Sequence, residues 1–127
     1  MKNECLPIIG KMIYNNEEMV AVGATFSATT SVQAFGKKIS LEGPGTYIIQ
    51  AHFGYYGVTG TPWTRQGIRT TENSYQSVVY DTTYASSREV ICAGLIHINT
   101  STQLEYYYSI NSNGNSYGVY VSVYKLD

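Results

Sequence analysis

Apolar side chains at every second position are the feature that most constrains the fold of this chain. The pattern is clearest over residues 46–56 (TYIIQAHFGYY), where one side of the segment carries Tyr47, Ile49, Ala51, Phe53 and Tyr55. Successive side chains of a β-strand point to opposite faces of a sheet, whereas a helix returns to one face every three to four residues. The segment is therefore predicted to be a strand with one apolar face.

Similar strand signals recur along the chain, and turn signals separate them about every 8–12 residues. The predicted strands cover residues 20–26, 38–41, 46–56, 63–71, 75–80, 88–99, 103–110 and 117–126. The predicted turns and loops cover residues 43–45, 57–62, 72–74, 81–87, 99–102 and 111–115. Residues 88–99 are the most apolar strand, and the Asn-Gly pair within 111–115 is the clearest hairpin signal. This pattern predicts an antiparallel sandwich or barrel of about eight to ten strands.

The length of 127 residues is sufficient for one domain with its own core. Residues 1–18 are the least periodic part and are predicted to form an N-terminal arm or irregular segment, which leaves residues 19–127 as the folded domain. Within residues 13–22 a turn or two of helix is conceivable, but Asn15-Asn16 favours a turn.

The sequence also bears on where the chain is made. No apolar run is long enough to cross a membrane. The N-terminal apolar stretch is interrupted by Glu4 and Pro7 and is too short for a signal peptide. Cys5 and Cys92 stand far apart, without the dense spacing of a disulfide framework, and are expected to be free thiols with Cys92 buried in a strand. These features favour a protein made in a reducing cytoplasm.

Charge and tyrosine content indicate the class of partner. Eight basic and nine acidic residues give a net charge of −1, so the chain lacks the basic excess typical of nucleic-acid binding. Charged residues make up 13% of the chain, against a usual value of about 25%, and tyrosine is abundant with 13 copies. Bulky residues occupy both faces of some predicted strands, as at Ile48-Ile49. Only one face of a sandwich strand meets the core, so we expect an aromatic outer face to meet another subunit. Scattered surface tyrosines are the alternative.

Several segments resemble the jelly-roll domains of the C1q/TNF-like family. Residues 45–51 (GTYIIQA) follow a Pro-Gly turn and are similar to the family's "G-x-Y-x-F/I-x-A" strand. Residues 117–126 look like its closing strand, and residues 90–110 like the preceding pair. Together with the opening strands at 19–30 and 36–41, the resemblance covers residues 19–127. It implies an all-β, two-sheet antiparallel jelly-roll sandwich.

The resemblance is greatest to C1q-like heads at the tips of phage or prophage tail fibres and baseplates. It implies a homotrimer that binds a host-surface ligand through exposed loops or subunit grooves. We therefore expect a non-enzymatic receptor-binding or adhesion head for a cell-surface glycan, made in the bacterial cytoplasm and displayed on a virion or extracellular surface. The alternative is a structural trimerisation or decoration module of a virion or spore surface that binds no ligand.

Aromatic loop segments are the candidate ligand-binding residues. Tyr55, Tyr56 and Trp63 flank the 57–62 loop, and Arg65 lies near it. Ligand sites combine apolar walls with a few polar groups, and tyrosine rings can stack on sugars while their hydroxyls form hydrogen bonds. A second, weaker candidate surrounds the 81–87 loop and comprises Asp81, Tyr84 and Arg88. The alternative for the first set is that its rings pack the end of the sandwich or a subunit seam.

No catalytic residue, metal ligand or cofactor is predicted. His52 and His97 have no partner at metal-ligand spacing and are expected in the core or an interface. Asp81 shares a segment with Ser86 and Ser87, but no nucleophile elbow is present. A glycosidase would need a carboxylate pair in a cleft. The candidates for such a pair lie in segments that indicate no deep cleft: Glu72, Asp81, Glu89 and Glu105.

Overall fold

A computed structural model describes residues 10–71 and 77–126, which form eight β-strands. The prediction of an all-β chain of eight to ten strands is confirmed. The strands are β1 (Lys11–Phe26), β2 (Thr29–Leu41), β3 (Gly45–Tyr56), β4 (Thr64–Thr70), β5 (Ser77–Thr83), β6 (Arg88–Ile98), β7 (Thr102–Ile110) and β8 (Gly114–Lys125).

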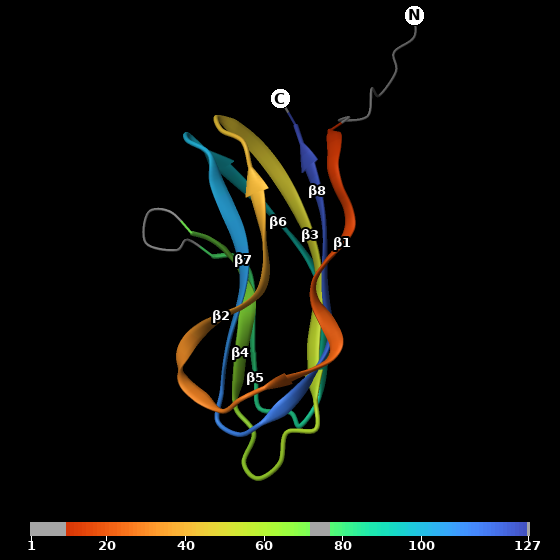
Figure 1. Ribbon diagram of the computed structural model, residues 1–127, viewed down its shortest axis with the longest axis vertical. Helices are drawn as coiled ribbons and strands as arrows, with labels where there is room; N and C mark the ends of the chain where they lie inside the picture. The colour runs from red at the N-terminus through yellow and green to blue at the C-terminus, as the bar shows by residue number, and fades with distance from the viewer. Residues whose placement is uncertain (1–9, 72–76, 127) are drawn as a thin grey trace, which may run out of the picture.

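The strands form two antiparallel sheets that face each other (Figure 1). The first sheet has the strand order β1-β8-β3-β6, and the second has the order β2-β7-β4-β5. Only β4 and β5 are both consecutive in the chain and paired within one sheet; every other connection between consecutive strands changes sheet. Two interleaved four-stranded sheets of this kind are the jelly-roll arrangement, so the predicted jelly-roll sandwich is confirmed.

The core lies between the sheets and follows the alternation seen in the sequence. The predicted inward face of β3 is confirmed, because all five of its side chains are at most 3% exposed: Tyr47, Ile49, Ala51, Phe53 and Tyr55. From the second sheet, Tyr106 and Tyr108 of β7 meet Phe26 with ring centroids 5.9 and 4.6 Å apart. Burial of this apolar and aromatic surface is the main driving force that holds the two sheets together.

The N-terminal boundary differs from the prediction. Residues 11–18 were expected in an irregular arm, but β1 begins at Lys11 and pairs with β8 from Lys125 onwards. The expected turn at Asn15-Asn16 is a bulge, where Asn16 has a φ of 49° and the register shifts between Tyr14 and Glu17. A bulge inserts an extra residue and breaks the period of two, which is why this strand lacks a visible alternation. Residues 1–9, including Cys5, lie outside the described residues.

Val22 of β1 lies on the outside of the first sheet. Side chains two positions apart share a face in a regular strand, but Val20 is buried while Val22 is 62% exposed. Gly23 has a φ of 87°, and the pairing of β1 with β8 shifts register between Val22 and Thr25. The register also shifts between Glu18 and Val20, so β1 is irregular on either side of these two valines.

The predicted hairpin at residues 111–115 is wrong, because β7 belongs to the second sheet and β8 to the first. Neither Asn113 nor Gly114 adopts the positive φ that an Asn-Gly hairpin turn requires. Asn113 instead accepts a 2.8 Å hydrogen bond from the backbone N–H of Ala28, so it ties two connections together. The 81–87 segment also begins later than expected, since β5 continues to Thr83. The predicted turn at 72–74 lies outside the described residues.

Candidate functional site

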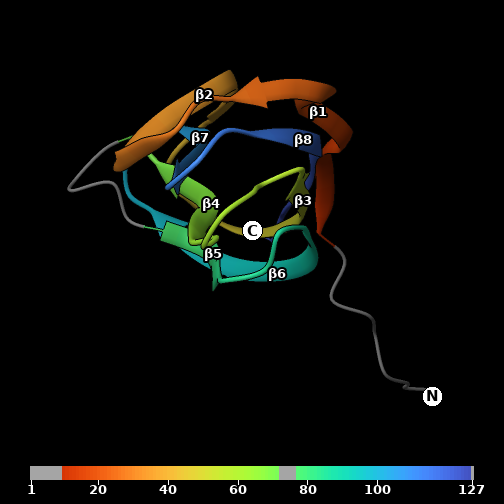
Figure 2. The same ribbon diagram turned by 90° about the horizontal axis from the view of Figure 1, so that it is seen from below.

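Four connections gather at the end of the sandwich opposite the chain termini (Figure 1). They are residues 27–28, 57–63, 84–87 and 111–113, called here the loop end. Figure 2, viewed from this end, shows the connections crossing the space between the two sheets. Hydrogen bonds brace them, from Val58 N–H to the Ser86 carbonyl (3.2 Å) and from the Ser112 hydroxyl to the Thr59 carbonyl (3.1 Å). The loop end is therefore a single braced surface.

The first set of predicted binding residues is divided by the fold. Tyr55 is fully buried, and its hydroxyl donates a 2.6 Å hydrogen bond to the Ala85 carbonyl, so it supports the loop end from within and is not available to a ligand. Tyr56 is half-buried and packs on the ring of Tyr117, with centroids 4.7 Å apart. Trp63 is half-buried, and its backbone N–H donates to Oδ1 of Asn111. Two of the three aromatics thus keep some exposed surface.

The side chain of Arg65 points away from these aromatics. Its neighbours in β4, Thr64 and Gln66, are buried between the sheets, so Arg65 points outward from the second sheet. It is exposed, and it lines a surface recess with Ser77 and Tyr80. The sequence placed Arg65 with Trp63 because of their proximity in the chain, but the alternation of β4 turns Arg65 onto the sheet's outer face.

The second set of predicted residues contains an ion pair and one open ring. Arg88 donates from Nε and Nη2 to the two carboxylate oxygens of Asp81, at 3.2 and 3.1 Å. This hydrogen bonding with Asp81 raises the pKa of Arg88. The pair joins the end of β5 to the start of β6, which is a structural role. Tyr84, between them, is 72% exposed and offers a free ring at the loop end.

The outer face of the first sheet carries residues that the sequence did not single out. Residues 88–99 were predicted as the most apolar strand, yet β6 is an edge strand, and its Ile91 and Leu95 are 83% and 65% exposed. Val22 and Tyr117 are exposed on the same face. The available signal was that residues 88–99 are apolar on both alternate faces, and only one face can meet the core.

Polar groups lie at the centre of this face, around a recess of about 380 Å³ that Gln50, His52 and Tyr120 help to line. Nε2 of His52 is 2.7 Å from a carboxylate oxygen of Glu89, and its ring stacks with Tyr120. Cys92 of β6 is a half-buried free thiol that packs against the core, and burial raises its pKa. His52 therefore lies on an outer sheet face and not in the core.

The described carboxylates considered for catalysis each meet a basic side chain. Asp81 binds Arg88, Glu89 contacts His52, and Glu105 contacts both Arg69 and Lys38. Nδ1 of His97 lies 2.8 Å from the hydroxyl of Thr46. Glu72 lies outside the described residues. Within residues 10–71 and 77–126, no three His, Cys, Asp or Glu side chains gather as a metal site would require. The same residues contain no helix suited to crossing a membrane.

Comparison with known sequences gives no family. No protein-family model matches the chain, and no curated protein matches it.

Comparison with solved structures finds similar folds in a virus. The chain is similar to a structure of infectious bursal disease virus strain Gt, with a TM-score of 0.56, 11% identity, and coverage of 86% of this chain and 31% of the viral chain. It is also similar to T=1 particles derived from that virus, with a TM-score of 0.55, 6% identity and coverage of 89% and 30%. A VP2 subviral particle of the virus is similar with a TM-score of 0.53 and 12% identity, over 82% of this chain and 30% of the viral chain. The chain thus spans less than a third of each viral chain, and what it shares with them is the fold of a β-sandwich domain.

Proposed function

We propose that this chain is a structural head that assembles as a homotrimer, through the outer face of the first sheet, on the surface of a virion. The observation that carries the proposal is the exposure of large apolar side chains on that face. Ile91, Leu95 and Val22 are each more than 60% exposed. Exposed apolar surface of this kind is a feature of protein–protein contacts, because its burial removes it from water.

The neighbouring side chains of this face are suited to an interface. Tyr117 and Tyr120 each combine an apolar ring with a hydroxyl, as interface tyrosines do. Glu89 is paired with His52, and Glu18 accepts a hydrogen bond from Tyr120. These two carboxylates near the apolar residues therefore already have partners within the same chain. Three copies around one axis follow from the resemblance to C1q/TNF-like domains, and closed symmetry buries the face on every copy.

The virion setting rests on two similarities. The domain folds like part of the structures of infectious bursal disease virus, and its segments resemble C1q-like heads of phage fibres. The first set of structures comes from a virus and from particles derived from it, and the second set comes from phage fibres. In this setting the chain is made in a bacterial cytoplasm and displayed on the assembled particle, and it has no catalytic role.

Light scattering of the purified chain with matched variants tests the assembly. The wild type should give about three times the 14.1 kDa chain mass. Ile91→Lys combined with Leu95→Lys should give the monomer mass with an unchanged β-sheet circular dichroism spectrum. Val32→Lys is the control, because Val32 is 41% exposed but belongs to the second sheet. A monomeric wild type at micromolar concentration would refute the proposal.

A second candidate function is receptor binding by the loop end, with a cell-surface glycan as ligand. It is favoured by the open ring of Tyr84 and by the partly exposed rings of Tyr56 and Trp63. Several weak sites on one particle would add to one another by multivalency. A glycan array probed with the wild type and with Tyr84→Ala tests this role. Glycan binding by the wild type that is weakened in Tyr84→Ala would support this role. A stable oligomer that binds no glycan would support the structural role only.

A further inference from the structure

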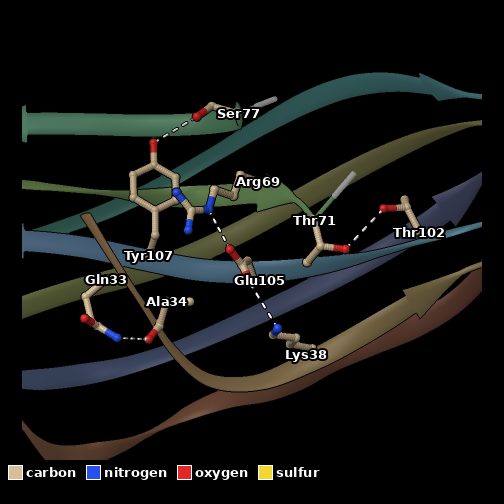
Figure 3. A network of polar contacts seen from close by, with 9 residues as sticks. All are labelled: Gln33, Ala34, Lys38, Arg69, Thr71, Ser77, Thr102, Glu105 and Tyr107. Atoms are coloured by element: carbon tan, nitrogen blue, oxygen red, sulfur yellow. Dashed lines mark hydrogen bonds and ion pairs between the residues drawn. The ribbon is translucent and has the colours of Figure 1, made fainter. Parts of the chain in front are cut away.

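The outer face of the second sheet carries a concentration of positive charge on a chain that is slightly acidic overall. Three basic side chains lie on this face, namely Lys38 of β2 and Arg65 and Arg69 of β4. Among the described residues, Glu105 is the carboxylate that meets them. It lies 2.6 Å from Nε of Arg69 and 3.4 Å from Nζ of Lys38 (Figure 3). Glu105 is only 3% exposed, so its negative charge acts on these two side chains and is shielded from solvent.

Arg65 differs from the other two basic residues of the face. It is exposed, and no ion pair with a described carboxylate engages its guanidinium, whereas Arg69 and Lys38 both contact Glu105. A guanidinium carries a fork of N–H donors that matches a carboxylate in two parallel hydrogen bonds. Arg65 is therefore a free anion-binding group at the edge of a positive surface.

Next to Arg65 lies a recess of about 270 Å³, lined also by Ser77, Tyr80 and Tyr107. Tyr107 of β7 lies across β4, and its hydroxyl is 3.0 Å from the hydroxyl of Ser77 on β5 (Figure 3). Gly67, which pairs with both Tyr107 and Tyr80, makes this possible. A methyl group at Gly67 would lie 2.7 Å from the Tyr107 hydroxyl, so the glycine leaves room for the ring.

Tyr107 forms the floor of the recess and is held in place, whereas Tyr80 forms an exposed wall. Tyr107 is 4% exposed and is fixed by Ser77 and by the guanidinium of Arg69, which lies 5.0 Å from the ring centroid. Tyr80 is 67% exposed, so its ring is free to cover a ligand. A site with a fixed polar floor, an exposed aromatic wall and an unpaired cation has the elements of a small-ligand site.

We propose that this recess binds an acidic sugar residue, such as a uronic or sialic acid at the end of a glycan. The carboxylate would meet Arg65, the apolar side of the sugar ring would lie on Tyr80, and the sugar hydroxyls would reach the hydroxyls of Ser77 and Tyr107. The proposal names a ligand class and a site that are separate from the loop end. It does not rest on the trimer, because the recess is complete in one copy and the first sheet lies on the other side of the sandwich.

NMR titration of the ¹⁵N-labelled chain tests the proposal with glucuronic acid, N-acetylneuraminic acid and glucose. Glucose is the matched neutral probe, because it differs from glucuronic acid by the carboxylate alone. The acidic sugars should shift the amide signals of Arg65, Tyr80 and Tyr107, with an affinity at least about tenfold above that of glucose, since a charge-assisted bidentate pair is lost with glucose. Acetate and phosphate in parallel distinguish recognition of a sugar from binding of any anion.

Variants complete the test. Arg65→Gln should weaken binding of glucuronic acid at least about tenfold, and Tyr80→Ala should weaken it for acidic and neutral sugars alike. Lys11→Gln is the control, being an exposed cation outside the recess, and it should bind as the wild type does. Because the spectra of each variant report its folding directly, loss of the fold is not confused with loss of the site.

Three results would overturn the proposal: equal binding of glucose and glucuronic acid, equal binding of acetate and the sugar acids, or unchanged affinity in Arg65→Gln. None of them bears on the oligomeric state, which light scattering measures separately.

Discussion

The hydroxyl of Tyr106 lies in the middle of the core, where it donates a 2.9 Å hydrogen bond to Oε1 of Gln66. Both side chains are fully buried between the sheets. Burial raises the pKa of Tyr106 well above its ordinary value of 10.0, because the phenolate would have to exist without water. This single residue therefore links the stability of the fold to pH in the alkaline range.

The chain should lose stability as the pH rises above about 10, since the unfolded state then releases the Tyr106 proton while the folded state retains it. Below the unfolded pKa both states hold the proton, and the contribution is fully present. Tyr106→Phe should flatten the decline of unfolding free energy between about pH 10 and 12, by up to about 1.4 kcal/mol per pH unit. Urea unfolding at several pH values measures this slope. Below about pH 9 the wild type and Tyr106→Phe should show the same slope, because Tyr106 keeps its proton in both states there.

Two valines distinguish the inner and outer faces of the first sheet. Val121 of β8 is 1% exposed, and Val22 of β1 is 62% exposed. Val121→Asp should prevent folding, because a buried charge without a partner costs several kcal/mol. Val22→Asp should fold and retain the circular dichroism spectrum of a β-sandwich. A soluble, folded Val121→Asp chain would contradict the assignment of this face to the core.

At the level of elements, Asn111 links the loop between β7 and β8 to the loop between β3 and β4. Its Oδ1 accepts from the backbone N–H of Trp63 at 2.9 Å, its Nδ2 donates to the Thr61 carbonyl, and its own N–H donates to the Trp63 carbonyl. Asn111 thus fastens together two loops that are far apart in the chain.

Asn111→Ala should lower the free energy of unfolding by about 1–2 kcal/mol, because it removes two side-chain hydrogen bonds and leaves backbone groups to water. Thermal unfolding measures the loss. Asn99→Ala, in the exposed connection at the opposite end, should change stability by less than about 0.5 kcal/mol. Equal effects at the two sites would mean that the loop end is no more strongly braced than an ordinary turn.

At the level of the whole molecule, the two outer faces differ in chemistry. The first sheet presents apolar residues such as Ile91 and Leu95, and the second presents the basic cluster around Glu105. Assembly through the first sheet should therefore respond little to salt, because hydrophobic contacts are not screened as charges are. The trimer mass in light scattering should persist between about 0.1 and 1 M NaCl. Dissociation at high salt would assign the contact to the charged face instead.

The sequence by itself determined the strands and their inward faces wherever the period of two was unbroken. The side chains of β3 were placed correctly, because alternation is a local property of an extended backbone. The prediction was wrong over residues 11–18, where bulges break that period. Turn residues were found correctly at 111–113, but their role was not, because a turn within one sheet and a connection between sheets use the same residues.

Only the tertiary structure decided which strands lie at an edge and which side chains share a surface. The apolar segment 88–99 became an edge strand with Ile91 exposed, since strand order depends on pairing between residues far apart in the chain. Tyr55 and Tyr56 are neighbours in sequence, yet one supports the loop end from within and the other lies at its surface. The recess beside Arg65 joins residues from three strands, and no spacing in the sequence encodes that contact, because it exists only when those strands pair.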